Sequence, residues 1–234
     1  MSFEKKSVLI TGGTGALGHV VAERFLKEGA SVATSYIFED ELKYLTESFR
    51  KQVQIVRADV TDDEDVAALF HQVGSKFGKV DILINIVGGF VQGAPVKNVA
   101  TKDWERMLDI NLKSVFLCSR QYLNQDGDRA YGRIISMSAM PGLNPSAGKA
   151  AYSVSKAGVS VFTKVLGEEL KGTGITANAI APSIIRTPAN EKSMPEEDLA
   201  KWVTPEEIAD TMMFLCSANG RSVNGVTIPV YGGV

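Results

Sequence analysis

The chain has 234 residues, with 25 basic and 27 acidic side chains, and a formal net charge of −2. With 44% hydrophobic and 22% charged residues, its composition is that of a soluble globular protein that can bury one core as a single domain, residues 1–234. The balanced charge argues against nucleic acid as a partner, because phosphate binding favours a clustered excess of Lys and Arg.

Membrane and metal sites are also not expected from this sequence. The longest apolar stretch, residues 80–91, is interrupted by Asp81 and Asn85, and the apolar run 8–10 is too short for a signal-peptide core. We therefore expect a cytoplasmic protein. Two histidines and two cysteines without metal-ligand spacing predict neither a metal centre nor a disulfide framework.

Short apolar runs alternate with longer amphipathic segments along the chain. They predict strands at 8–10, 32–34, 53–56, 80–84, 133–136, 175–180 and 227–230, and helices at 16–28, 39–49, 61–77, 102–122, 151–171 and from 204 onward. Capping boxes are expected at Thr61 with Glu64 and at Thr204 with Glu207, and Pro229 indicates an edge strand. Uniformly apolar strands between helices predict an α/β fold: a doubly wound parallel sheet (Rossmann fold) of about seven strands with helices on both faces.

A glycine-rich loop joins the first predicted strand to the first predicted helix. Its Gly13-x-Gly15-x-x-Gly18 spacing is typical of dinucleotide binding, because glycines let the backbone approach a pyrophosphate at the helix N-terminus. Methyltransferases that use S-adenosylmethionine share this fold, so the loop alone does not define the chemistry.

The second predicted strand bears on which nucleotide is bound. An acid at its end would bind the adenosine ribose, but residues 33–37 contain none; the first acid is Glu39 and the first base is Lys43. NADP and NAD both stay open as cofactors. The missing acid disfavours a methyltransferase.

Tyr152 and Lys156 are four residues apart, on one face of a predicted helix. A free tyrosine has a pKa of about 10 and is a poor acid–base group at neutral pH, but a nearby cation lowers that pKa. An exposed helix pair without catalytic function is the alternative. The surrounding sequence favours the catalytic interpretation.

Seven stretches, one of which contains this pair, lie at 11–18, 58–60, 84–88, 109–111, 132–138, 151–158 and 178–187. In order and spacing they resemble the short-chain dehydrogenase/reductase family over nearly the whole chain. The resemblance implies an NAD(P)-dependent oxidoreductase that acts on a small carbonyl or alcohol substrate. It also implies a homodimer or homotetramer in which helices 102–122 and 151–171 pair between subunits; Val159, Phe162 and Leu166 would serve that interface or the core.

The resemblance also implies roles for individual residues. Tyr152 would protonate the carbonyl oxygen, Lys156 would lower the pKa of Tyr152 and bind the nicotinamide ribose, and Asn111 would hold a water that relays protons to Lys156. Asp59 would bind the adenine amine. The implied cofactor contacts are Gly12, Gly13, Thr14, Gly15, Ala16, Leu17, Gly18, Tyr36, Asp59, Val60, Asn85, Gly88, Tyr152, Lys156, Pro182, Ile185 and Thr187.

Several positions depart from the family pattern. The middle glycine of the loop is displaced to Gly15, and the position of the catalytic serine, thirteen residues before Tyr152, is held by Ala139. Ser138 precedes it, and one step along an extended chain reverses the side chain's direction. Ser138 is thus a catalytic candidate only if a slipped loop presents it. The alternatives are a pterin-like reductase that lacks the serine, or a cofactor-binding protein whose catalysis has decayed.

Overall fold

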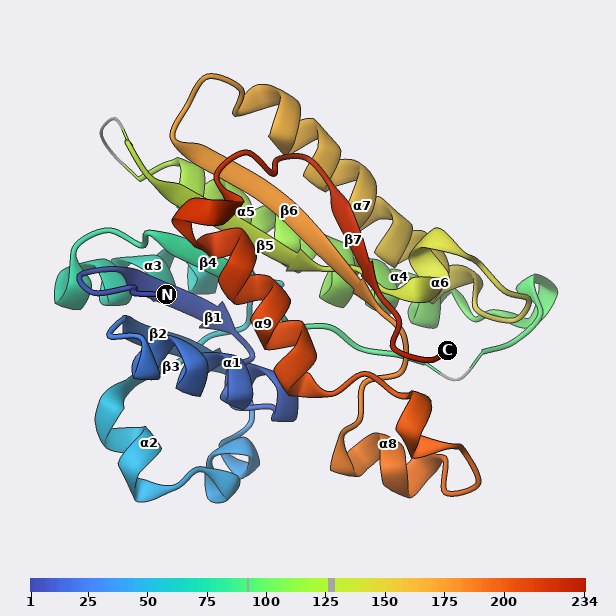
Figure 1. Ribbon diagram of the computed structural model, residues 1–234. Helices are drawn as coiled ribbons and strands as arrows, with labels where there is room; N and C mark the ends of the chain where they lie inside the picture. Colours follow the sequence, from blue (N-terminus) through green and yellow to red (C-terminus); the bar gives the residue numbers. More distant parts are fainter. Residues whose placement is uncertain (92, 126–128) are drawn as a thin grey trace.

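A computed structural model describes residues 1–91, 93–125 and 129–234. Its sheet has seven parallel strands in the order β3-β2-β1-β4-β5-β6-β7 (Figure 1). The strands are β1 Ser7–Thr11, β2 Ser31–Tyr36, β3 Val53–Arg57, β4 Ile82–Asn85, β5 Gly132–Met137, β6 Ile175–Pro182 and β7 Thr227–Val230. The predicted doubly wound sheet is confirmed, and β7 with Pro229 lies at an edge as expected.

Helices cover both faces of this sheet (Figure 1). They are α1 Ala16–Lys27, α2 Glu47–Gln52, α3 Asp63–Phe77, α4 Thr101–Leu108, α5 Ser114–Leu123, α6 Met140–Leu143, α7 Ala150–Glu169, α8 Pro188–Ser193 and α9 Pro205–Cys216. Side chains alternate along each strand. In β1, Val8 and Ile10 therefore pack in the core with α1 and α9, while Leu9 packs in the other core with α3, α5 and α7.

The strand order reverses direction between β1 and β4, and the candidate site lies at this reversal. In an open parallel sheet, such a reversal leaves a crevice at the carboxyl ends of the two strands. Thr11, the last residue of β1, ties the two loops there: its Oγ1 accepts hydrogen bonds from the amides of Ile86 at 3.1 Å and Val87 at 3.3 Å.

Three predicted helices differ in detail. Residues 39–49 are divided into a 3-10 helix, Glu39–Tyr44, and α2, because the Thr46 hydroxyl caps a new helix start. The expected cap at Thr61 is wrong: Asp62 caps α3, while the Thr61 hydroxyl donates to Asp59. The box at Thr204 is confirmed. Residues 102–122 form α4 and α5 with a π-helical turn, Asp109–Lys113, between them.

No helix within the described ranges is long and apolar enough to cross a membrane. Across the same residues, no group of three or more His, Cys, Asp or Glu side chains is placed to hold a metal ion.

Candidate active site

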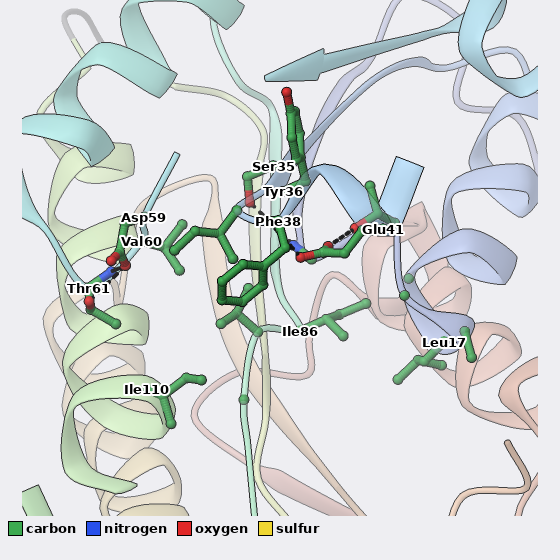
Figure 2. Close-up of a pocket in the computed structure, with 18 of the residues that line it drawn as sticks. Leu17, Ser35, Tyr36, Phe38, Glu41, Asp59, Val60, Thr61, Ile86 and Ile110 are labelled. Carbon is green, nitrogen blue, oxygen red and sulfur yellow. Dashed lines mark hydrogen bonds between the residues drawn. The ribbon is translucent and has the colours of Figure 1, made fainter. Parts of the chain in front are cut away.

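A cavity of about 1710 Å³ opens along the carboxyl ends of β1 to β4 (Figure 2). The loops after these four strands supply most of its lining, and residues 187–189 close it from the C-terminal part of the chain. Eleven of the predicted cofactor residues line it: Gly12, Thr14, Gly15, Ala16, Leu17, Gly18, Tyr36, Asp59, Val60, Gly88 and Thr187.

The glycine loop has the backbone that a pyrophosphate site needs. Gly12 has a φ of +69°, which other residues rarely adopt, and a Cβ on Gly18 would lie 2.3 Å from the Gly12 carbonyl oxygen. At the displaced Gly15 a Cβ would make only an ordinary contact, 3.5 Å from that oxygen. The displaced glycine is therefore not required for packing, while the turn and the close approach are preserved.

The N-terminus of α1 opens into this loop with its backbone amides available. Gly15 is the N-cap and offers no side chain to bond the first amides, and no acidic residue lies in the first turn. Ala16 and Leu17 of that turn line the cavity. Free amides and the positive end of the helix dipole favour an anion here. The residues present therefore fit a dinucleotide pyrophosphate.

The adenosine end of the cavity lies beyond the ends of β2 and β3. Asp59 Oδ1 accepts hydrogen bonds from the amide and hydroxyl of Thr61, at 2.9 and 2.7 Å, which hold the carboxylate in place. Val60 and Ile110 add apolar surface on the same side of the cavity (Figure 2). Phe38 and Glu41 also line the cavity, and no sequence pattern indicated them. Phe38 is the N-cap of the 3-10 helix and Glu41 lies within it; the strand and helix patterns did not predict the path of this segment.

Tyr152 and Lys156 lie on α7, and neither is part of this lining; Tyr152 lines a separate, small cavity together with residues 148–151. A Cβ on Gly88 would lie 2.8 Å from Asn111 Oδ1 and 3.1 Å from Lys156 Nζ. Gly88 lines the cavity, and glycine at this position leaves room for both groups directly behind that lining. Tyr152 is half-buried, with its ring edge-to-face against Phe90 at 5.2 Å between centroids.

The charge state of this pair differs from the expectation. Burial raises the pKa of Tyr152 to about 12, so the expected lowering by Lys156 is not found. Burial also lowers the pKa of Lys156 to about 8. The Lys156 ammonium donates to the Met137 carbonyl oxygen at 2.8 Å. Tyr152 therefore keeps its proton at neutral pH, as a proton donor must.

Asn111 is fully buried in the π-helical turn, with a relative exposure of 0%. Its Oδ1 accepts from the Gly89 amide at 2.9 Å, and its Nδ2 donates to the Gly89 carbonyl at 3.0 Å and to Ser155 Oγ at 3.1 Å. This side chain therefore joins the loop after β4 to α7. π turns inserted in α-helices occur frequently at functional sites.

The hydroxyl of Ser138, the serine candidate, is bonded to α7, and Ser138 does not line the cavity. Its buried hydroxyl donates to the Lys156 carbonyl oxygen at 2.8 Å and shares a hydrogen bond with Ser160 Oγ at 2.9 Å. Ser160 lies eight residues beyond Tyr152, which is about 12 Å along the helix axis. The loop is not slipped: residues 140–143 form the short helix α6, with Ala139 in extended conformation at its N-cap.

Besides Tyr152 and Lys156, four predicted cofactor contacts do not line the cavity. Gly13 packs against β2, where a Cβ would lie 2.2 Å from the Thr34 hydroxyl. Asn85 is buried with its amide toward Ser136. Ile185 packs against the core that contains α9, and Pro182 is paired within the sheet. Each has a structural role that its spacing alone did not reveal.

The chain matches a family model described as enoyl-(acyl carrier protein) reductase over residues 13–234. It belongs to the short-chain dehydrogenase/reductase family, whose members are oxidoreductases that use NAD or NADP. The 3-oxoacyl-[acyl-carrier-protein] reductase FabG of Thermotoga maritima is 31% identical over 246 residues, covering 100% of this chain and 99% of that protein.

Two further relatives illustrate the range of substrates in the family. A 2-dehydro-3-deoxy-L-rhamnonate dehydrogenase (NAD(+)) of a Sphingomonas strain is 33% identical over 236 residues, covering 97% of this chain and 94% of the relative. The crystal structure of a variant actinorhodin polyketide ketoreductase with NADPH superposes with a TM-score of 0.90 at 29% identity, covering 100% of this chain and 98% of that one.

Proposed function

We propose that this chain reduces a ketone or 3-oxoacyl group to an alcohol, reversibly, with Tyr152 as the proton donor and Lys156 as its positioning partner. The observation that carries the proposal is the meeting of Lys156 Nζ and Asn111 Oδ1 at Gly88, on the lining of a cavity that also contains the glycine loop. The relatives support it, since their names describe 3-oxoacyl and hydroxy-acid chemistry. Cofactor and substrate would then be bound in one domain, residues 1–234.

When bound, the reduced nicotinamide supplies the hydride. The chain's own residues do the rest: Tyr152 is protonated at neutral pH and gives its proton to the developing alkoxide. Lys156 adds positive charge and binds the nicotinamide ribose. Asn111 has both amide hydrogens engaged with Gly89 and Ser155, so its side chain positions the loop, and a relay water would be held by the one remaining lone pair of Oδ1.

Lys156 gives the reaction a pH dependence. Because burial lowers its pKa to about 8 in the free enzyme, the ammonium that binds the ribose is lost as the pH rises through that value. We expect kcat/KM for the reduced cofactor to fall with rising pH, with an apparent pKa of about 8. A profile measured from pH 6 to 10 at constant ionic strength checks this. A profile that stays flat to pH 10 would contradict the role of Lys156.

A pterin-like reductase is the second candidate. The specific observation in its favour is that the Ser138 hydroxyl is bonded to α7, while the next residue, Ala139, has no hydroxyl to offer a substrate oxygen. A conjugated substrate that needs less polarisation of a carbonyl oxygen would react without that donor. Activity confined to quinonoid pterins would establish this candidate.

We also propose that the chain forms a homodimer or homotetramer in the cytoplasm. Val159 and Leu166 are buried in the core, so they do not serve an interface. Exposed apolar side chains on α5 and α7 support one instead: Phe116, Val161 and Val165 are 42%, 61% and 47% exposed. Light scattering should give two or four times the chain mass of 25.2 kDa; a monomer at micromolar concentration would overturn this.

The proposed reaction is tested by the loss of reduced-nicotinamide absorbance. The purified chain is mixed with NADH or NADPH and a panel of ketones, 3-oxoacyl thioesters and quinonoid pterins. Turnover on a ketone or 3-oxoacyl thioester supports the proposal. Binding of the cofactor without turnover on any member of a broad panel would favour a cofactor-binding protein instead.

A further inference from the structure

The carboxylate of Glu41 lines the end of the cavity beyond β2, on the side of Leu17 and across from Asp59, although Glu41 is not part of β2 (Figure 2). Residues 39–44 turn back as a 3-10 helix and bring Glu41 over the glycine loop. Its Oε1 accepts from the Phe38 amide at 3.1 Å, and its Oε2 accepts from the hydroxyl of Thr14. The carboxylate is thus anchored between the loop after β2 and the loop that holds the pyrophosphate.

The described residues that line this end, 14–17, 35–38, 40, 41 and 58–61, include no lysine or arginine. Lys43 lies just outside and pairs with Asp40, with the ammonium 2.5 Å from the carboxylate. Arg57 is next to Tyr36 in the sheet but does not line the cavity. The lysines and the arginine that do line it come from α4 and α8. A second carboxylate, Glu39, accepts from the Tyr36 hydroxyl at 3.0 Å.

The two nicotinamide cofactors would interact differently with Glu41, because NADP(H) carries a 2′-phosphate where NAD(H) has a ribose hydroxyl. Each carboxylate oxygen of Glu41 accepts one hydrogen bond and has a further lone pair for a ribose hydroxyl. A 2′-phosphate in the same place would bring like charges together at an end of the cavity without a compensating cation. The acid that the sequence lacks at the end of β2 is therefore supplied by the 3-10 helix.

We propose that Glu41 is the residue that selects the cofactor, and that this chain binds NAD(H) in preference to NADP(H). The inference rests on the proposed function, because it assumes that the cavity holds a nicotinamide dinucleotide. The inference goes beyond the proposed function because it assigns the choice between NAD(H) and NADP(H) to one side chain outside the glycine loop and the strands.

The test is equilibrium binding of NADH, NADPH, ADP-ribose and 2′-phospho-ADP-ribose, measured by calorimetry on the intact protein. ADP-ribose and its 2′-phosphate lack the nicotinamide, so they report on the adenosine end without any turnover. Glu41→Gln removes the charge but keeps the shape. Glu47→Gln is the matched control, because Glu47 is an exposed acid on α2 that pairs with Lys51 and does not line the cavity.

We expect the parent to bind NADH and ADP-ribose about tenfold more tightly than their 2′-phosphorylated forms, equivalent to roughly 1.4 kcal/mol. Glu41→Gln should reduce this ratio at least threefold, mainly through tighter binding of the phosphorylated forms, while Glu47→Gln leaves it unchanged. Raising the salt concentration should lower the ratio of the affinities for the unphosphorylated and the 2′-phosphorylated ligands. The decrease should be larger in the parent than in Glu41→Gln, because salt screens the repulsion between exposed charges.

Two results would overturn the inference alone: a parent that binds NADPH as tightly as NADH or more tightly, or an unchanged ratio in Glu41→Gln. If neither dinucleotide nor ADP-ribose binds the parent, the proposed function fails and this inference fails with it. The two failures are therefore distinguishable in one set of titrations.

Discussion

Replacement of Tyr152 by Phe is expected to lower kcat roughly 10²- to 10⁴-fold, the range typical for loss of a general acid. The substitution removes only the hydroxyl, and the ring keeps its edge-to-face contact with Phe90. Cofactor affinity should therefore change less than about threefold, because the glycine loop and the end of β2 are untouched. Steady-state kinetics together with a cofactor titration on the same sample measure both effects.

Tyr131→Phe provides the matched control for this variant. The Tyr131 hydroxyl donates to the Cys216 carbonyl oxygen at 2.6 Å, at the amino end of β5, whereas the cavity lies at the carboxyl ends of the strands. Its loss should lower stability by about 1 kcal/mol and leave kcat unchanged. If Tyr152→Phe retains most of the parent's turnover, the proton comes from another group and the proposed chemistry is wrong.

Replacement of Ala139 by Ser is expected to raise kcat/KM about tenfold or more on a ketone substrate. A donor to the developing oxyanion typically contributes a few kcal/mol to transition-state stabilisation. Ala139 is the extended N-cap of α6, where serine is also favourable for the helix. Parallel kinetics on parent and variant, with one ketone and one pterin, show whether the gain is confined to the carbonyl substrate.

Ser138→Ala is the control for that gain. Its hydroxyl bonds to the Lys156 carbonyl oxygen and to Ser160, so its removal should cost roughly 1–3 kcal/mol of stability through the unsatisfied partners. Turnover per folded molecule should stay close to that of the parent. If Ser138→Ala abolishes turnover while urea unfolding is unchanged, our assignment of Ser138 to a packing role is contradicted.

Most of the fold could be predicted from local patterns. Apolar strands such as residues 8–10 and 133–136 and the cap at Thr204 depend on neighbours in sequence, and the structure confirms them. The break between residues 44 and 47 and the π turn at Asp109–Lys113 were missed. The hydrophobic pattern of residues 102–122 continues through the π turn, so nothing in its spacing signals the extra residue.

The site was predictable where backbone geometry dictates it. Gly12, Gly18 and Gly88 make approaches that a Cβ would obstruct, and their spacing carries that information. The positions of Ser138 and Glu41 depend on contacts with Ser160 and Thr14, residues distant in sequence. Pairings of this kind follow from tertiary packing, which a single sequence does not display.

The central claim is that a nicotinamide bound in this cavity transfers hydride to a carbonyl carbon. The most direct test is to supply NADH or NADPH that carries deuterium on each face of C4 and to analyse the products of the ketone panel by mass spectrometry. We predict that deuterium from one face only appears at the carbinol carbon, and that Tyr152→Phe greatly reduces its appearance. Reduced cofactor that binds but transfers deuterium to no member of the panel would contradict the account.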